Sequence, residues 1–171
     1  LIEELAAEAG SARGRPMVPL RISPAGGYAV GLALYAGILE IAIVDYAGGV
    51  IALTSELIAP VDPGDFARHV DRRIQDLTLE HRLIGNRLYG IGLSAPGPAL
   101  SRDGNRWHIV RNLPGWKGAP LRDILEDCLQ LPVWIENDAT AAALAEYYLG
   151  GLIRRCSTAV VILLGHGVGA G

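Results

Sequence analysis

Residues 131–151, which read LPVWIENDATAAALAEYYLGG, decide how this chain folds. The apolar run at 133–135 predicts a buried strand, three polar residues follow it, and an alanine-rich segment of strong helix formers then runs to two glycines. A strand that ends where a helix begins delivers polar residues to the edge of an α/β sheet at which ligands bind. Asp138 is therefore interpreted in two ways, as the N-cap of the helix or as a reactive carboxylate.

Length and composition bound the class of protein. The chain has 171 residues, enough for one domain or for one domain with a fragment of another, and half of them are hydrophobic, which allows a sizeable core. A net charge of −3 gives no electrostatic footprint for nucleic acid. No apolar run approaches the roughly 18 residues of a membrane-spanning helix, and residues 1–10 lack the features of a signal peptide.

The two cysteines, Cys128 and Cys156, lie far apart and lack the spacing of metal ligands. This pattern argues against a disulfide scaffold or a zinc site and favours a reducing, cytoplasmic location. Cys128 also falls on the apolar face of its expected helix, so we expect it to be part of the core.

Both ends of the chain predict a fragment of a longer protein, because the sequence starts without Met and ends on Gly-Val-Gly-Ala-Gly. Residues 1–9 predict a short helix, and residues 10–15 predict a linker, after which Pro16 and Pro19 limit regular structure. Residues 1–27 are interpreted as the linker or tail of an upstream domain, with a frayed terminus as the alternative.

Three apolar segments separated by short turns predict an antiparallel meander over residues 28–34, 38–46 and 50–58. Apolar residues at helical spacing then predict a helix over residues 63–84, capped by Asp62 or Asp65. Strands at 88–93, 131–135 and 157–164 alternate with helices from there on, and we expect strand 157–164 to be central. The order βββαβαβαβ predicts an α/β fold, a mixed sheet with helices on its faces, in the ribonuclease-H-like arrangement of actin-like ATPases and sugar kinases.

Three stretches in this order carry a resemblance to a known family: GIGLSAPGP at 90–98, NLPGW at 112–116 leading to ENDATAAA at 136–143, and LGHGVGAG at 164–171. Together they resemble the ROK family, whose members are bacterial sugar kinases and sugar-responsive transcriptional repressors. The resemblance implies that residues 28–171 form the N-terminal subdomain of the kinase-like fold, with the second subdomain outside the chain.

The resemblance also implies a sugar site. In the family an Asn-Asp pair holds sugar hydroxyls, and the Asp acts as base on the hydroxyl that attacks ATP; the match places these roles on Asn137 and Asp138, the latter catalytic only in a kinase. A carboxylate within reach of a hydroxyl can accept its proton during phosphoryl transfer, and an amide offers both a donor and an acceptor. Ser94 and Gly97 would line the sugar cleft, and Asn112 would add an amide or serve only as a turn residue.

Two phosphate loops depart from the family pattern. ROK kinases carry an Asp-x-Gly-Gly-Thr loop for ATP phosphate and metal, but residues 33–37 read Ala-Leu-Tyr-Ala-Gly, so Ala33 replaces the Asp and Tyr35 and Ala36 replace glycines. Phosphate loops need small residues because backbone N–H groups must approach the anion. His166 replaces the Thr of a Gly-Thr-Gly loop, either as a phosphate contact when protonated or as a residue without a ligand role. The degenerate phosphate-loop positions are Gly37, Gly165, His166 and Gly167.

Degraded phosphate loops beside an intact sugar pair favour a sensor over a kinase. We therefore interpret the chain as the sugar-sensing part of a ROK-type transcriptional repressor. In this interpretation residues 1–21, with Gly14-Arg15-Pro16 just before the first strand, resemble the linker after a winged helix-turn-helix domain. The expected partners are a sugar or sugar derivative, DNA only through an absent upstream domain, and further copies of the chain, with no membrane. We expect no cofactor or metal in this chain, since the zinc motif of the family lies beyond Gly171. The alternatives are a hexose kinase that uses ATP and Mg²⁺, and an actin-like interaction domain without a sugar site.

Overall fold

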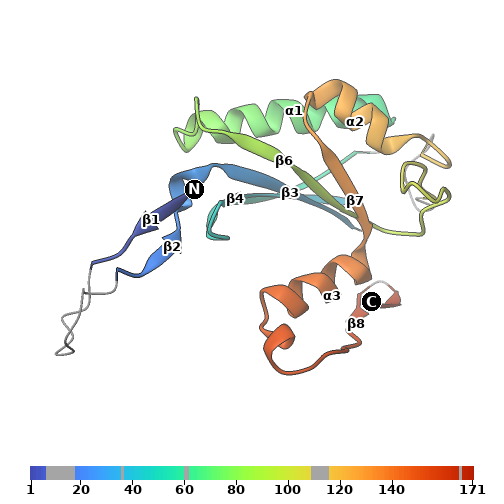
Figure 1. The fold of residues 1–171 in the computed structure, drawn as a ribbon. Coiled ribbons are helices and arrows are strands. Elements are labelled where there is room, and N and C mark those ends of the chain that lie inside the picture. The colour runs from blue at the N-terminus through green and yellow to red at the C-terminus, as the bar shows by residue number, and fades with distance from the viewer. Residues whose placement is uncertain (7–17, 36, 60–61, 109–115, 166) are drawn as a thin grey trace.

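A computed structural model describes residues 1–6, 18–35, 37–59, 62–108, 116–165 and 167–171. Its main body is a five-stranded mixed sheet in the order β5-β4-β3-β6-β7, with helices on both sides (Figure 1). This is the ribonuclease-H-like arrangement that the order of elements predicts. The strands are β3 (Tyr28–Tyr35), β4 (Ile38–Asp45), β5 (Val50–Leu57), β6 (Leu88–Ala95) and β7 (Val133–Asn137).

The first three strands form the predicted antiparallel meander, and β6 and β7 run parallel to β3. Glycines at positive φ make both meander turns, Gly37 at 79° and Gly48 at 89°. Asp45 closes the second turn, since its Oδ1 accepts the backbone N–H groups of Ala47 and Gly49 at 2.9 and 2.8 Å. Because β6 and β7 are parallel neighbours, their carboxyl ends lie at the same edge of the sheet.

One face of the sheet is covered by α1 (Pro63–Glu80) and α2 (Leu121–Leu129) (Figure 1). Alternate residues of β3 and β4 point toward these helices and are buried: Val30, Leu32, Leu34, Leu39, Ile41 and Ile43. The α1 residues that meet them recur at helical spacing: Phe66, Val70, Ile74 and Leu77. Cys128 is half-buried and packs against this core, as its position on α2 predicts.

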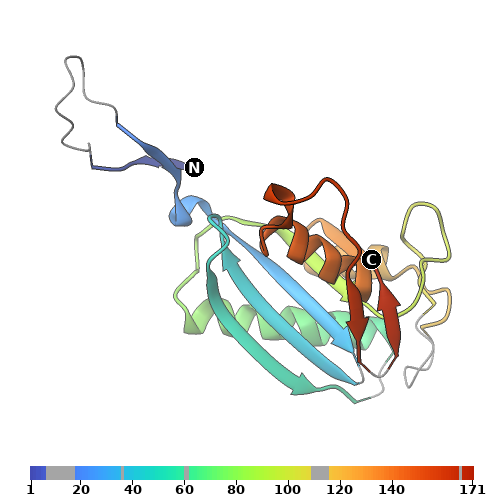
Figure 2. The same cartoon turned by 90° about the horizontal axis from the view of Figure 1, so that it is seen from below.

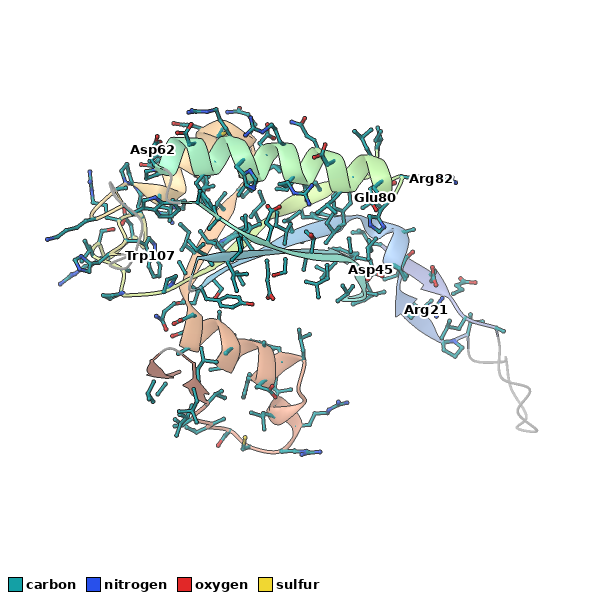
Figure 3. The ribbon with its side chains drawn as sticks, turned by 180° about the vertical axis from the view of Figure 1, so that it is seen from behind. Arg21, Asp45, Asp62, Glu80, Arg82 and Trp107 are labelled. Carbon is teal, nitrogen blue, oxygen red and sulfur yellow. The ribbon has the colours of Figure 1, made fainter. Side chains whose placement is uncertain are left out.

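The ends of α1 follow from local chemistry. Asp62 is its N-cap, since its Oδ1 accepts the N–H groups of Gly64 and Asp65 at 2.8 and 3.0 Å. The helix stops at Glu80, four residues earlier than expected, and Arg82 then takes a positive φ of 57°. Asp62 lies at the amino end of α1, and Trp107 lies in the connection between β6 and α2 (Figure 3).

The prediction of a helix near the amino terminus is wrong. Residues Ile2–Glu4 form strand β1, which pairs antiparallel with β2 (Leu20–Ile22), and a short 3-10 turn, η1 (Pro24–Gly26), leads into β3. Figure 2 shows this two-stranded ribbon projecting away from the main sheet. An isolated helix of nine residues is marginal in water, whereas a partner strand supplies cross-strand hydrogen bonds. The expected linker at 10–15 lies outside the described residues.

The prediction of a central strand at 157–164 is also wrong. Only Ile162–Leu164 is a strand, β8, and it pairs with β9 (Val168–Ala170) in a separate hairpin. The intervening α3 (Asp138–Tyr148) and η2 (Leu152–Arg154) carry the chain below the sheet (Figure 1). The glycine-rich end therefore contributes the strand β9, and the hairpin exposes apolar side chains: Ile162, Leu164 and Val168 are 64%, 76% and 79% exposed.

Among the described residues, no helix is both long enough and apolar enough to cross a membrane. Cys128 and Cys156 are both free thiols.

Candidate functional site

The strand β7 runs two residues further than predicted. Glu136 and Asn137 stay extended because they pair with Ser94 and Ala95 of the parallel strand β6. The strand therefore ends on Asn137, and α3 begins on Asp138. The polar residues are thus placed at the junction of strand and helix, as expected, but their roles in that junction differ from the prediction.

Asn137 is the N-cap of α3. Its Oδ1 accepts the backbone N–H groups of Ala139 at 3.0 Å and Thr140 at 3.3 Å, which are two of the unpaired donors at the start of the helix. The interpretation of Asp138 as the N-cap is therefore wrong. An amide oxygen serves this role well because it has two lone pairs for two donors.

Asp138 is the first residue of α3 and is half-buried. Its Oδ1 accepts the N–H of Ala139 at 2.9 Å, and its Oδ2 has no hydrogen-bond partner within the part of the chain that the structure describes. A negative charge in the first turn of a helix is stabilised by the helix dipole. Asp138 therefore presents one carboxylate oxygen that can accept a proton donor from a ligand.

The loop after β6 is held against this junction. The Nδ2 group of Asn137 donates a hydrogen bond to the carbonyl oxygen of Gly97 at 3.1 Å, and Gly97 has a φ of 92°, which glycine adopts without strain. Of the residues predicted for a sugar site, the structure thus joins Gly97, Asn137 and Asp138 at one edge of the sheet. Asn112 lies outside the described residues.

Ser94 lies on the open face of the sheet, opposite α1 and α2. It lines a hollow of about 410 Å³ together with Glu136 and Ala141 of α3. The strand registers place one row of residues across this hollow: Leu53, Ala42, Gly31, Gly92 and Trp134. The next row is Ser55, Glu40, Ala33, Ser94 and Glu136. The inner strands contribute small side chains to the first row, so the floor of the hollow lies between Leu53 and Trp134.

Sequence reasoning missed the walls of this hollow. Trp134 and Glu136 alternate along β7, so both point to the face that Ser94 occupies on β6. All three residues at 133–135 are apolar, so the sequence did not show which of them is exposed. Trp134 is in fact 64% exposed, whereas its neighbour Val133 is 2% exposed.

The first phosphate-loop position carries a carboxylate across from it. Ala33 pairs with Glu40 of β4, and the Tyr35 hydroxyl donates a hydrogen bond to Oε1 of Glu40 at 2.7 Å. This bond to Glu40 is the main cause that raises the pKa of Tyr35 above its ordinary value. Gly37 forms the following turn, and its carbonyl oxygen accepts the N–H of Ile58 at 2.8 Å. Ala36 lies outside the described residues.

The second phosphate-loop position lies in the turn of the β8–β9 hairpin. The N–H of Gly165 donates to the carbonyl oxygen of Gly167 at 2.9 Å, and His166 lies outside the described residues. The strand β9 packs directly on the first turn of α3: a Cβ atom at Gly169 would lie 2.8 Å from Cβ of Ala139, and one at Gly171 would lie 2.5 Å from its carbonyl oxygen. These two glycines bring the glycine-rich end beside the sugar-site candidates, a role that the sequence did not indicate.

No group of three His, Cys, Asp or Glu side chains within the described ranges is arranged to hold a metal ion. The junction of β6, β7 and α3 offers the free carboxylate oxygen of Asp138 and backbone carbonyl groups. The nearby hollow adds the hydroxyl of Ser94. Such groups bind ligand hydroxyls by hydrogen bonds.

The sequence profile of the ROK family matches residues 42–171. The crystal structure of a ROK family transcriptional regulator, described as a homologue of the Mlc protein of Escherichia coli, superposes on the whole chain and on 42% of its own length, with 30% identity and a TM-score of 0.73.

Two curated relatives represent the two kinds of similar protein. The DNA-binding transcriptional repressor Mlc of Escherichia coli (strain K12) is 27% identical over 100% of this chain and 42% of its own length. A glucokinase of Halalkalibacterium halodurans is 38% identical over 66% of this chain and 34% of its own length. The chain spans less than half the length of the curated relatives it matches. Because the family profile covers most of the sequence, this chain belongs to the ROK family.

Proposed function

We propose that this chain is the sugar-sensing part of a ROK-type transcriptional regulator, which binds a sugar at Asp138 and does not phosphorylate it. The observation that carries the proposal is the chemistry of residues 33–37. A phosphate loop presents backbone N–H groups and a carboxylate that holds the metal. Here Ala33 offers a methyl group, and the bulky Tyr35 follows it.

The charge beside Ala33 supports the same conclusion. Glu40 pairs directly with Ala33 across the strands, and its carboxylate is bonded to the Tyr35 hydroxyl. A carboxylate at this place repels the phosphates of ATP. The methyl side chain of Ala33 has no oxygen atom that could hold Mg²⁺. The residues present therefore do not fit ATP with its metal, and we derive no phosphoryl transfer through them.

The amino-terminal ribbon is a second support. The matches to the Mlc repressor and to the structure of the Mlc homologue include all of the chain, residues 1–27 among them, whereas the match to the glucokinase covers two thirds of it. Residues 1–27 lie before the first strand of the main sheet and contain the ribbon of β1 and β2. We infer that this segment connects the sugar-sensing fold to an upstream DNA-binding domain.

In this proposal Asp138 accepts a hydrogen bond from a sugar hydroxyl. The sugar lies between this subdomain and a second one. Closure of the two subdomains on the sugar then repositions the DNA-binding domain, which couples sugar binding to DNA affinity.

The experiment is isothermal calorimetry of the full-length protein with a panel of hexoses and amino sugars, alongside a coupled assay for ATP turnover. We expect one sugar to bind, Asp138→Ala to abolish its binding, and no sugar-dependent ATP turnover. Asp127→Ala is the matched control, because Asp127 is an exposed carboxylate of α2 outside the site. Sugar-dependent turnover at kinase-like rates would overturn the proposal.

The second candidate function is an ATP-dependent hexose kinase, which the 38% identity with a glucokinase favours. In that case Asp138 removes the proton from the attacking hydroxyl. The ATP assay separates the two functions. If no sugar binds in the calorimetry, an actin-like interaction domain without a sugar site is the remaining alternative.

A further inference from the structure

We propose that the outer edge of β5 is an interface with a second copy of this chain. In the proposed dimer the β5 strands of two copies pair antiparallel about a two-fold axis at Ser55, and the two main sheets become one continuous sheet. The strand β5 is outermost in the main sheet, and it pairs with β4 alone among the described residues (Figure 2). This inference does not depend on the proposed function in sugar sensing.

The direction of the backbone groups defines the unpaired edge of β5. The N–H of Ile58, directly after the strand, donates to the carbonyl oxygen of Gly37 at 2.8 Å, on the side of β4. Successive residues of a strand direct their backbone groups to alternate sides, so those of Leu53, Ser55 and Leu57 point away from the sheet. An unpaired row of this kind is a template for pairing with another strand.

The opposite edge of the main sheet is shorter and has a partner within the chain. The strand β7 has five residues, and the outward N–H of its Val133 donates to Oε1 of Glu126, a residue of α2, at 2.9 Å. The strand β5 has eight residues, and neither proline nor lysine, which commonly block pairing at a sheet edge, occurs among them. The β5 edge is therefore the one that keeps its donors and acceptors for another strand.

The side chains of β5 allow two copies to pair without charge repulsion. Glu56 is the sole charged residue of the strand and faces α1, where His69 Nε2 lies 2.7 Å from its Oε1 and Arg73 Nε lies 3.2 Å from its Oε2. On the opposite face Leu53 and Leu57 are 68% and 86% exposed. Two identical edges thus bring no like charges together, and each carries apolar surface that a second copy can cover.

The outward backbone groups and the two-fold symmetry select the register. Residues directly opposite each other in an antiparallel pair lie on the same face, and they exchange both hydrogen bonds when their backbone groups point to the partner. An axis at Ser55 places this residue opposite its own copy and Leu53 opposite Leu57 of the partner subunit. A shift of the axis in either direction would leave one of the two leucines opposite a residue outside the regular part of β5.

The same pairing completes one wall of the hollow on the open face of the sheet. Leu53 lines the hollow on its β5 side. In the dimer Leu57 of the partner subunit lies next to Leu53 on that face, because directly opposite residues share a face. The second copy therefore contributes a side chain to the wall of the hollow.

The first test compares variants of the full-length protein by sedimentation velocity over a range of concentrations. Ser55→Pro removes the outward N–H at the centre of the pairing but no bond to β4, and proline is tolerated on an edge strand in this orientation. We expect the variant to keep the circular dichroism spectrum of the wild type. We expect the Kd of its dimer to rise about tenfold or more, because both hydrogen bonds of the central pair are lost.

A second variant, Leu57→Lys, tests the apolar contact without changing the backbone. It should also raise the Kd of the dimer, since Leu57 faces Leu53 of the partner subunit in the proposed register. Val50→Lys is the matched control, because Val50 is 65% exposed on the same strand but lies outside the paired segment. We expect this control to dimerise like the wild type.

A disulfide cross-link tests the position of the axis. In the proposed register the two Cα atoms at position 55 lie about 5.5 Å apart, within the range that a disulfide spans. Mild oxidation of full-length Ser55→Cys should therefore give a covalent dimer in which the two introduced thiols are joined, as mass spectrometry of the linked peptides shows. Val50→Cys, treated in the same way, should give no dimer joined at position 50.

Three results would overturn the interface. The first is a full-length protein that is monomeric at every concentration, or whose dimer is unaffected by both Ser55→Pro and Leu57→Lys. The second is a thiol at position 55 that links to another segment of the same copy, because the edge is then covered within one chain. The third is a dimer that Leu164→Glu abolishes and Ser55→Pro leaves intact, which would assign the contact to the hairpin of β8 and β9. None of these results bears on sugar binding, which calorimetry measures separately.

Discussion

The indole ring of Trp116 meets the ring of Phe66 edge to face, with the ring centroids 4.9 Å apart and the planes at 64°. Both side chains are fully buried, at 1% and 0% exposure. Phe66 lies in the first turns of α1, and Trp116 lies in the connection that leads into α2. This pair fixes the long connection after β6 to the core, and the NLPGW motif thus ends on a structural residue.

Replacing Trp116 with Ala is expected to destabilise the fold by about 3–5 kcal/mol, because it removes a large buried ring and leaves a cavity against Phe66. The measurement is urea denaturation followed by circular dichroism. Trp134→Ala is the matched control, since this side chain is 64% exposed and its loss should cost far less. Equal losses for the two tryptophans would contradict the assignment of Trp116 to the core.

Gly90 and Gly92 are expected to respond in opposite ways to the same substitution. A Cβ atom at Gly90 would lie 2.6 Å from Cζ3 of Trp134 and 2.9 Å from the carbonyl oxygen of Pro132, whereas one at Gly92 meets nothing within 4 Å. Gly90→Ala should therefore destabilise the protein by about 1–3 kcal/mol through crowding. Gly92→Ala should be neutral or stabilising by up to about 1 kcal/mol, because it restricts the unfolded chain. Thermal unfolding of the two variants under one condition decides the question.

The cap of α1 is expected to make stability depend on acid pH. Hydrogen bonds from the backbone, that of Asp65 first, lower the pKa of Asp62 below its ordinary value of 3.8. A carboxylate with a lowered folded-state pKa contributes stability above the unfolded pKa, and this stability is lost as the pH falls through the folded pKa. The effect therefore belongs to the range below about pH 4.

Asp62→Asn isolates this contribution, because Asn caps a helix but does not titrate. We expect the melting temperatures of wild type and variant to lie close together at neutral pH, and the wild type to lose more between pH 5 and pH 3. Asp62→Ala, which cannot cap, should be less stable at both values. Parallel acid profiles for wild type and Asp62→Asn would contradict the role of Asp62.

The hairpin of β8 and β9 is expected to cause residues 1–171 to self-associate when they are prepared alone. Ile162, Leu164 and Val168 are all mostly exposed, and apolar patches of this kind associate in water. Sedimentation velocity over a range of concentrations should show species larger than the monomer, and Leu164→Glu should reduce them. Leu79→Glu on α1 is the control, because Leu79 is 59% exposed but lies far from the hairpin in sequence and fold. A single sharp monomer at high concentration would contradict the prediction.

The sequence predicted the meander, the helices α1 and α2 and a mixed sheet, because these elements have strong local patterns. It misplaced β7 by two residues, since Glu136 and Asn137 are polar and stay extended through pairing with β6. For the same reason it could not tell which residue caps α3. The segment Ile2–Glu4 contains good helix formers, but a strand 16 residues further on overrides that local preference.

The site was predictable in its residues but not in their arrangement. The sequence placed Asn137 and Asp138 together, and the family resemblance placed Gly97 in the lining of the sugar cleft. It could not show that Asn137 and Gly97 are bonded to each other, because that contact joins residues 40 positions apart. The hollow was equally out of reach, since its rows depend on the register of four strand pairs.

Only one face of the sheet packs against α1 and α2, so alternate residues of each inner strand serve two different purposes. In β3 the even-numbered residues from Val30 to Leu34 pack on the helices, whereas Gly31 and Ala33 lie on the opposite face of the sheet. A substitution at every second position can therefore alter ligand chemistry without touching the residues that hold the domain together. A phosphate loop built on such a strand can lose its carboxylate by drift while the scaffold keeps its melting temperature, so catalysis can be lost from a lineage while its fold persists.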